Sequence, residues 1–85
     1  MGAAFRTRAT LVTAELPPFT AAFHRESGIT HLLVEPAPDI LAALSDEPLT
    51  LAGLRARLAE RFELDGDGLA ARLDELVAAG LVEAA

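Results

Sequence analysis

The chain has 85 residues, a formal net charge of −6 and no cysteine. A domain of this length buries only about 60–65% of its unfolded surface, which leaves little room for a deep active-site pocket beside the core. The absence of cysteine excludes disulfides and thiolate metal sites, and the acidic balance disfavours binding to nucleic acid or to an anionic membrane.

The chain shows no targeting or membrane-spanning segment. No apolar run approaches the roughly 20 residues needed to cross a bilayer, and the first residues lack the pattern of a signal peptide. We therefore expect a cytoplasmic protein whose residues 1–4 form a loose tail. Every basic residue is arginine, which is typical of a GC-rich bacterial genome.

The first expected strand covers residues 5–14, where polar Arg6 and Thr10 alternate loosely with apolar Phe5 and Leu11. Pro17 and Pro18 then end any regular element, because proline cannot donate to a strand ladder.

Residues 19–34 read as two β-strands joined by a turn at residues 26–28. Gly28 can take a positive φ, and the flanking Phe, Thr, Ile and Val suit a half-buried pleated surface. Two registers are open at this point. A two-residue turn at Ser27 and Gly28 places His24 opposite His31, whereas a Gly28 bulge places Phe23 opposite His31.

Three helices follow the hairpin. The first begins near Pro38, which suits a first-turn position, and runs to about Leu44, with Asp39 complementing the positive helix start. The second is capped by Thr50 and carries an apolar stripe at spacings of three and four: Leu51, Leu54, Leu58 and Phe62.

The third helix follows a loop at residues 65–68 and carries Leu69, Leu73, Leu76 and Val77 on one face. Gly80 is a helix stop after which Leu81 can fold back, and residues 82–85 form an extended tail or the stub of a wing. Strands followed by three helices predict an α+β fold: a three-stranded antiparallel N-terminal sheet on a three-helix winged helix-turn-helix bundle, all in one domain.

Two patterns resemble metal sites, and both are interpreted as structural. His24 and His31 could meet across the hairpin, but two histidines without a third ligand are weak evidence for a metal. Residues 63–74 resemble an EF-hand loop, yet Asp74 replaces the bidentate Glu, and the third helix must begin near Asp67, inside that loop. We therefore expect neither a metal nor a cofactor.

No serine, histidine and acid arrangement is visible, so we expect no catalysis by this chain. A transcriptional winged helix that binds DNA is the alternative function, with a structural subunit that dimerises as a third possibility. The DNA reading is disfavoured because the third helix would present mainly carboxylates to the phosphates, on Asp67, Asp74 and Glu75.

The strand at residues 29–34 contains no charge and no proline, so nothing in its sequence blunts its edge. An extended peptide could add to that edge through main-chain hydrogen bonds, with the gap toward the third helix as its pocket. The open alternative is that the first strand or a second copy of the protein covers the edge.

Four segments in this order resemble the PqqD family of small peptide chaperones, also called RiPP recognition elements. They are residues 27–33 in the hairpin, 40–44 in the first helix, 48–54 at the start of the second helix and 73–82 at the end of the third. The sequence Thr30-His31-Leu32-Leu33 is similar to the branch that accompanies an HPr-kinase-related protein. One departure is Val34, where related sequences place Asp or Asn as a helix cap.

The resemblance implies binding of a precursor peptide's leader as an extra strand, and presentation of that peptide to a modifying enzyme or to the HPr-kinase-related protein. It implies a monomer or a dimer without cofactor. Arg72 would pair with an acidic leader side chain. The peptide-binding residues would be Ile29, Thr30, His31, Leu32, Leu33, Val34, Leu69, Arg72, Leu73 and Leu76.

Overall fold

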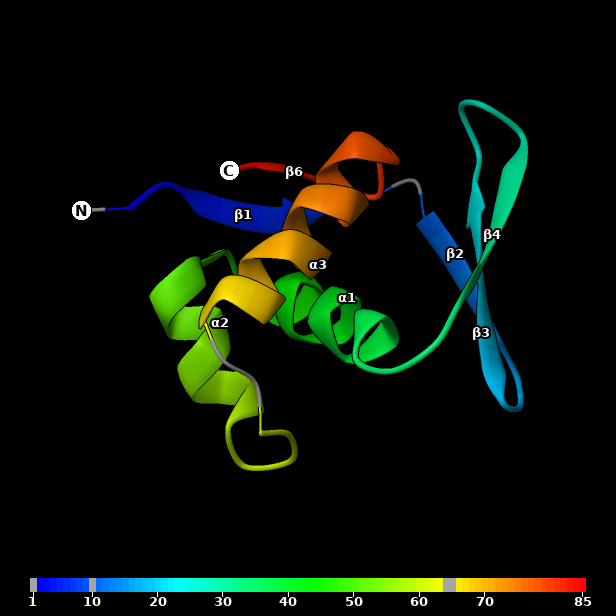
Figure 1. Ribbon diagram of the computed structural model, residues 1–85. Helices are drawn as coiled ribbons and strands as arrows, with labels where there is room; N and C mark the ends of the chain where they lie inside the picture. Colours follow the sequence, from blue (N-terminus) through cyan, green and yellow to red (C-terminus); the bar gives the residue numbers. More distant parts are fainter. Residues whose placement is uncertain (1, 10, 64–65) are drawn as a thin grey trace.

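The structure is a computed structural model that describes residues 2–9, 11–63 and 66–85. The α+β class is confirmed: three helices and two three-stranded antiparallel sheets make up the described chain (Figure 1). The elements are β1 (Ala4–Thr7), β2 (Leu11–Leu16), β3 (Phe19–His24), β4 (Ile29–Leu33), α1 (Ala37–Asp46), β5 (Leu49–Thr50), α2 (Leu51–Leu58), α3 (Gly66–Ala78) and β6 (Val82–Ala84).

One sheet has the strand order β2-β3-β4 and contains the expected hairpin. Ala22 lies opposite His31, so both registers proposed from the sequence are wrong. The reason is the length of the turn, because residues 25–28 form a four-residue loop between the pair His24 and Ile29. Gly28 does take a positive φ of 74°, as its place in the turn requires.

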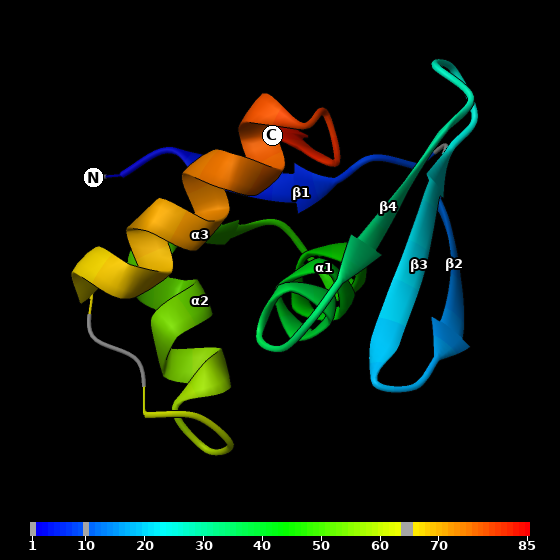
Figure 2. The same cartoon turned by 45° about the vertical axis from the view of Figure 1, so that its right-hand side comes forward.

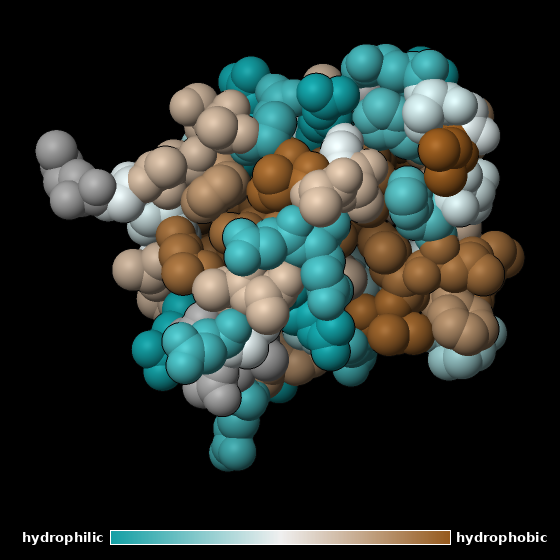
Figure 3. Space-filling model, turned by 45° about the horizontal axis from the view of Figure 1, so that its top comes forward, coloured by the Kyte–Doolittle hydropathy of each residue, from teal (hydrophilic) through white to brown (hydrophobic). Residues whose placement is uncertain are grey.

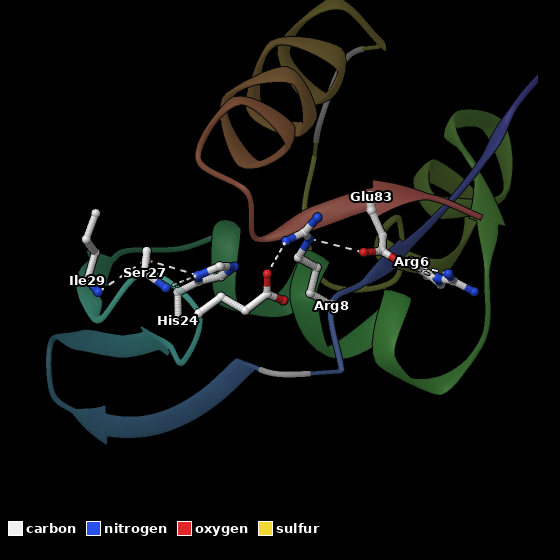
Figure 4. A network of polar contacts seen from close by, with 7 residues as sticks. Arg6, Arg8, His24, Ser27, Ile29 and Glu83 are labelled. Carbon is white, nitrogen blue, oxygen red and sulfur yellow. Dashed lines mark hydrogen bonds and ion pairs between the residues drawn. The ribbon is translucent and has the colours of Figure 1, made fainter.

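Side chains hold this longer loop in place. The Ser27 hydroxyl lies 3.0 Å from His24 Nδ1, the Ser27 amide donates to the same nitrogen, and the Ile29 amide donates to the Ser27 hydroxyl (Figure 4). Because the Ser27 amide donates to Nδ1, the neutral form of the ring carries its proton on Nε2. These side-chain hydrogen bonds therefore stabilise the four-residue loop. The turn-forming residues of the sequence alone could not predict this loop length.

The second sheet has the order β5-β1-β6 and corrects the expectation of one strand over residues 5–14. That segment contains two strands, because the chain turns near Arg8 and the two parts pair in different sheets. Ala4, which we placed in a loose tail, pairs with Thr50 at the start of β1. Residues 82–84, expected as a tail or wing stub, form β6 and pair with β1.

Ion pairs fasten β1 to β6. Glu83 accepts from Arg6 at 2.8 Å and lies 3.1 Å from Arg8, and Arg8 also reaches Glu26 in the hairpin loop at 3.6 Å (Figure 4). These side chains are partly exposed, so each pair contributes at most about 1 kcal/mol. Their main effect is to link the hairpin loop to the C-terminal strand.

The helix starts agree with the sequence pattern to within one residue, and α1 and α3 also end close to the expected positions. The second helix is shorter than expected, because α2 ends at Leu58 and Phe62 lies beyond it. Pro38 and Asp39 lie in the first turn of α1, and Asp39 also pairs with Arg61 at 3.0 Å. At the end of α3 the Leu81 amide donates to the Leu76 carbonyl, and the Gly80 amide donates to the Val77 carbonyl. Gly80 has a φ of 78°, so the expected stop is a Schellman motif with Leu81 folded back and buried.

The cap of α2 allows a direct test. The Thr50 hydroxyl accepts a hydrogen bond from the Gly53 amide at 3.1 Å. Replacing Thr50 with alanine should lower the free energy of unfolding by about 1 kcal/mol, since one helix-terminal donor loses its partner. Urea denaturation measures this loss, and Thr50→Ser is the control because serine keeps the hydroxyl. Equal losses for the two variants would contradict a capping role.

The core lies between α1, α2 and α3, and both sheets pack against its sides (Figures 1 and 2). The hairpin sheet contributes Ala22 from its inner face, with Leu11 and Leu33 packed beside it. The fully buried large side chains are Ile40, Leu44, Leu54, Leu69, Leu81 and Val82.

Candidate functional site

The edge strand of the hairpin sheet is unpaired on one side. Within the described chain β4 pairs with β3 alone, so its other edge presents free backbone groups. The strand Ile29–Leu33 contains no charge and no proline. An unblunted edge of this kind is a ready template for another extended segment.

A groove of about 260 Å³ runs beside this edge, between β4 and α3. Figure 2 shows β4 as the strand of its sheet nearest to α3, with β3 and β2 farther away. The groove is lined by His31, Leu32, Leu33, Val34, Glu35, Ala37, Arg72, Glu75, Leu76, Ala79 and Leu81. The free edge and a largely apolar groove therefore lie side by side.

Three charged side chains line the groove: Arg72 and Glu75 on α3, and Glu35 in the segment between β4 and α1. Arg72 lies 3.4 Å from Glu75, one turn along the helix, and both side chains are more than half exposed. An exposed ion pair of this kind is worth well under 1 kcal/mol. A carboxylate on an incoming peptide could therefore displace Glu75 from Arg72 at little cost.

The structure divides the ten predicted site residues into three groups. His31, Leu32, Leu33, Val34, Arg72 and Leu76 line the groove. Ile29 and Thr30 lie on the same strand beyond the groove, where their backbone can act but their side chains do not line it. Leu69 and Leu73 are buried in the core, with 0% and 3% of their surface exposed.

Five groove residues were missed by the sequence argument: Glu35, Ala37, Glu75, Ala79 and Leu81. Three of the groove positions, Arg72, Glu75 and Ala79, follow one another at helical spacings of three and four. These three residues form a stripe along α3 and its C-terminal end, beside the buried stripe of Leu69, Leu73 and Leu76. Their spacing in the sequence could therefore have identified them as neighbours on one helix face. Glu35, Ala37 and Leu81 needed the structure, and Leu81 reaches the groove because the chain reverses at Gly80.

A larger groove of about 440 Å³ lies at the opposite edge of the sheet, between β2 and α1. Its strand is less suited to pairing, because β2 carries the charged Glu15 and ends at Pro17 and Pro18. Charge and proline are the features that protect sheet edges from adding a strand. The smaller groove beside β4 is therefore the better candidate for an extended ligand.

The described residues give no sign of a metal centre or a membrane span. They contain no group of three or more His, Cys, Asp or Glu side chains that could hold an ion. In the resemblance to an EF-hand, Leu64 and Asp65 lie outside the described residues, and α3 begins at Gly66. None of the helices in residues 2–9, 11–63 and 66–85 is long and apolar enough to cross a bilayer.

Comparison with known proteins identifies a shared fold. No protein-family model and no curated protein matches the chain. The chain is similar to a solved structure described as lasso peptide synthetase B1 complexed with the leader peptide, with a TM-score of 0.71 and 22% sequence identity. The match covers 93% of this chain and 96% of the other, so the similarity extends over nearly the whole architecture.

Proposed function

We propose that this chain is a non-catalytic adaptor that binds the leader of a ribosomally synthesised precursor peptide. The observation that carries the proposal is the free, uncharged edge of β4 beside the groove of α3. The solved structure with the same fold is described as a complex with a leader peptide, which supports the same type of ligand here.

The leader would add to β4 as a fourth strand of the β2-β3-β4 sheet. Main-chain hydrogen bonds to β4 would provide affinity that depends little on sequence. Alternate leader side chains would enter the groove between Leu33 and Leu76, and this alternation would provide selectivity. Arg72 is the residue we assign to an acidic leader side chain.

The adaptor would present the held peptide to a modifying enzyme. The sequence resemblance to the PqqD family favours a partner of that system, either the enzyme itself or an HPr-kinase-related protein. The small size of the domain, which leaves little volume for an active site beside the core, supports a role in holding the peptide.

An amide NMR titration with leader segments from candidate precursor peptides of the source organism tests the proposal. We expect chemical-shift changes confined to residues 29–34 and to α3, because only this edge and this groove would contact the ligand. Chemical-shift changes at β2 and α1 instead would indicate that the peptide binds at the other edge of the sheet, and would overturn the assignment to β4. A well-folded protein without shifts for any candidate would contradict the leader-binding function.

The alternative of DNA binding finds little support in the structure. The exposed residues of α3 include Asp67, Asp74 and Glu75 against the single Arg72. Duplex DNA added in the same titration should therefore produce no salt-dependent binding.

A further inference from the structure

The outer face of the β2-β3-β4 sheet is apolar and uncovered. Residues opposite each other in a sheet share a face, so the register gives the members of this one. The outer face consists of Val12, Ala14, Leu16, Phe19, Ala21, Phe23, Thr30 and Leu32. The five large apolar members are each 40–61% exposed.

No ionisable side chain interrupts this face. Figure 3 shows apolar side chains gathered on the side of the molecule where this sheet lies in Figure 1. The inner face, in contrast, carries His24, His31 and Glu15 among its members. An antiparallel sheet with one solvated face normally carries polar residues on that face. Here the solvated outer face carries apolar residues instead.

The outer face also has a self-complementary shape. Its residues form three rows across the strands: Val12, Phe23 and Thr30; then Ala14, Ala21 and Leu32; then Leu16 and Phe19. The middle row has two alanines between rows that carry phenylalanine. A shallow trough therefore runs across β2 and β3, with an aromatic ridge on each side.

We propose that a second copy of this chain covers the outer face, forming a two-fold symmetric dimer by sheet-on-sheet packing. A two-fold axis between the first and second rows places Phe23 of each copy over Ala21 of the other. Such an interface is isologous, because both copies use the same patch and each contact occurs twice. The aromatic ridge of each copy then packs into the alanine trough of the other copy.

The area of the face matches a small specific interface. Weighted by their exposed fractions, the side chains present on the order of 600 Å² per copy, so a dimer would bury about 1,200 Å², the lower limit of standard interfaces. The largest apolar patch on a typical monomer is about 300–600 Å², and this face lies at the upper end of that range. The result is a reversible dimer whose population depends on concentration.

The charge distribution permits the pairing of two acidic chains. Each copy carries a net charge of −6, but none of it lies on the outer face. The repulsion between copies is therefore long-range and is screened by salt over about 10 Å at 0.1 M. The backbone edge of β4 stays outside the contact, and Leu32 is the one member of the outer face that also lines the groove.

Sedimentation equilibrium of the full chain from micromolar to millimolar concentration tests the dimer. We expect the mass to rise from 8.9 kDa toward twice that value, and to rise more readily at higher salt. Phe23→Glu should remain monomeric throughout. Val77→Glu is the matched control, because Val77 is also 40% exposed but lies on α3, away from the face, and this variant should dimerise normally.

Circular dichroism establishes that each variant is folded before its mass is measured, and Ala21→Glu provides a second test on the middle row. A wild-type chain that remains monomeric at millimolar concentration would overturn the proposal. So would a dimer that persists in both Phe23→Glu and Ala21→Glu. These results do not depend on any peptide, so they are separate from the outcome of the leader titration.

Discussion

Replacing Thr30 with proline should weaken the binding of a leader peptide about tenfold or more, which corresponds to roughly 1.4 kcal/mol. Thr30 is the second residue of the edge strand β4, and its side chain does not line the groove. The substitution therefore acts on peptide binding through the backbone, where proline removes a hydrogen-bond donor and bends the edge.

The register indicates which backbone groups face outward. Leu16 and Phe19 close a two-residue turn on the other side of β3, and such a closing pair exchanges hydrogen bonds across its hairpin. The next residue of β3, Thr20, and every second residue after it therefore point their backbone groups to β4. Alternate residues of β4 then point their backbone groups to β3, which leaves Thr30 and Leu32 directed to the free edge. Leu32→Pro should consequently have the same effect, whereas His31→Pro should disrupt the hairpin itself.

Thr30→Ala is the control for the proline variant, since it removes the same side chain and keeps the backbone donor. Isothermal titration calorimetry with a leader that gives shifts in the NMR titration measures all affinities. Unchanged affinity for both Thr30→Pro and Leu32→Pro, in proteins with an intact hairpin, would rule out pairing at this edge.

Leu54→Ala should have the largest effect on stability, lowering the free energy of unfolding by about 3 kcal/mol. Leu54 lies in α2 and has no exposed surface, so its truncation removes apolar contacts and leaves a cavity. A domain of this size has a total stability of about 5–10 kcal/mol, so the loss is a large share of it.

Chemical denaturation measures this loss, with Val77→Ala as the exposed control that should change stability by less than about 0.5 kcal/mol. Leu54 is not among the residues of the β4 groove. Leader affinity, measured where Leu54→Ala is still fully folded, should therefore be unchanged. A loss below 1 kcal/mol would mean that the three helices do not share the core described above.

Local patterns predicted the elements better than their pairing. The stripe of Leu51, Leu54 and Leu58 and the stop at Gly80 gave helices with nearly correct ends, because capping and helical periodicity act within a few residues. The unblunted sequence of β4 was also visible, since it depends on the absence of charge and proline in one short segment, but whether another strand covers its edge was left open.

Interactions between distant segments could not be predicted in the same way. The division of residues 5–14 into β1 and β2 depends on the pairing of Phe5 with Ala84, far along the chain. The hairpin register depends on a bond network at Ser27 that lengthens the loop. For the site, the resemblance to the PqqD family named both Arg72 and Leu73, but only packing showed that Arg72 lines the groove while Leu73 lies in the core.

The position of β1 has a consequence for the synthesis of the protein. β2, β3 and β4 follow one another directly, so their sheet can form as soon as Leu33 has left the ribosome. β1 is made before them, yet one of its two partners, β6, is made after every other described strand. Until then one edge of β1, the first of the described strands, has no native partner, and the β5-β1-β6 sheet is completed only once translation has passed Ala84.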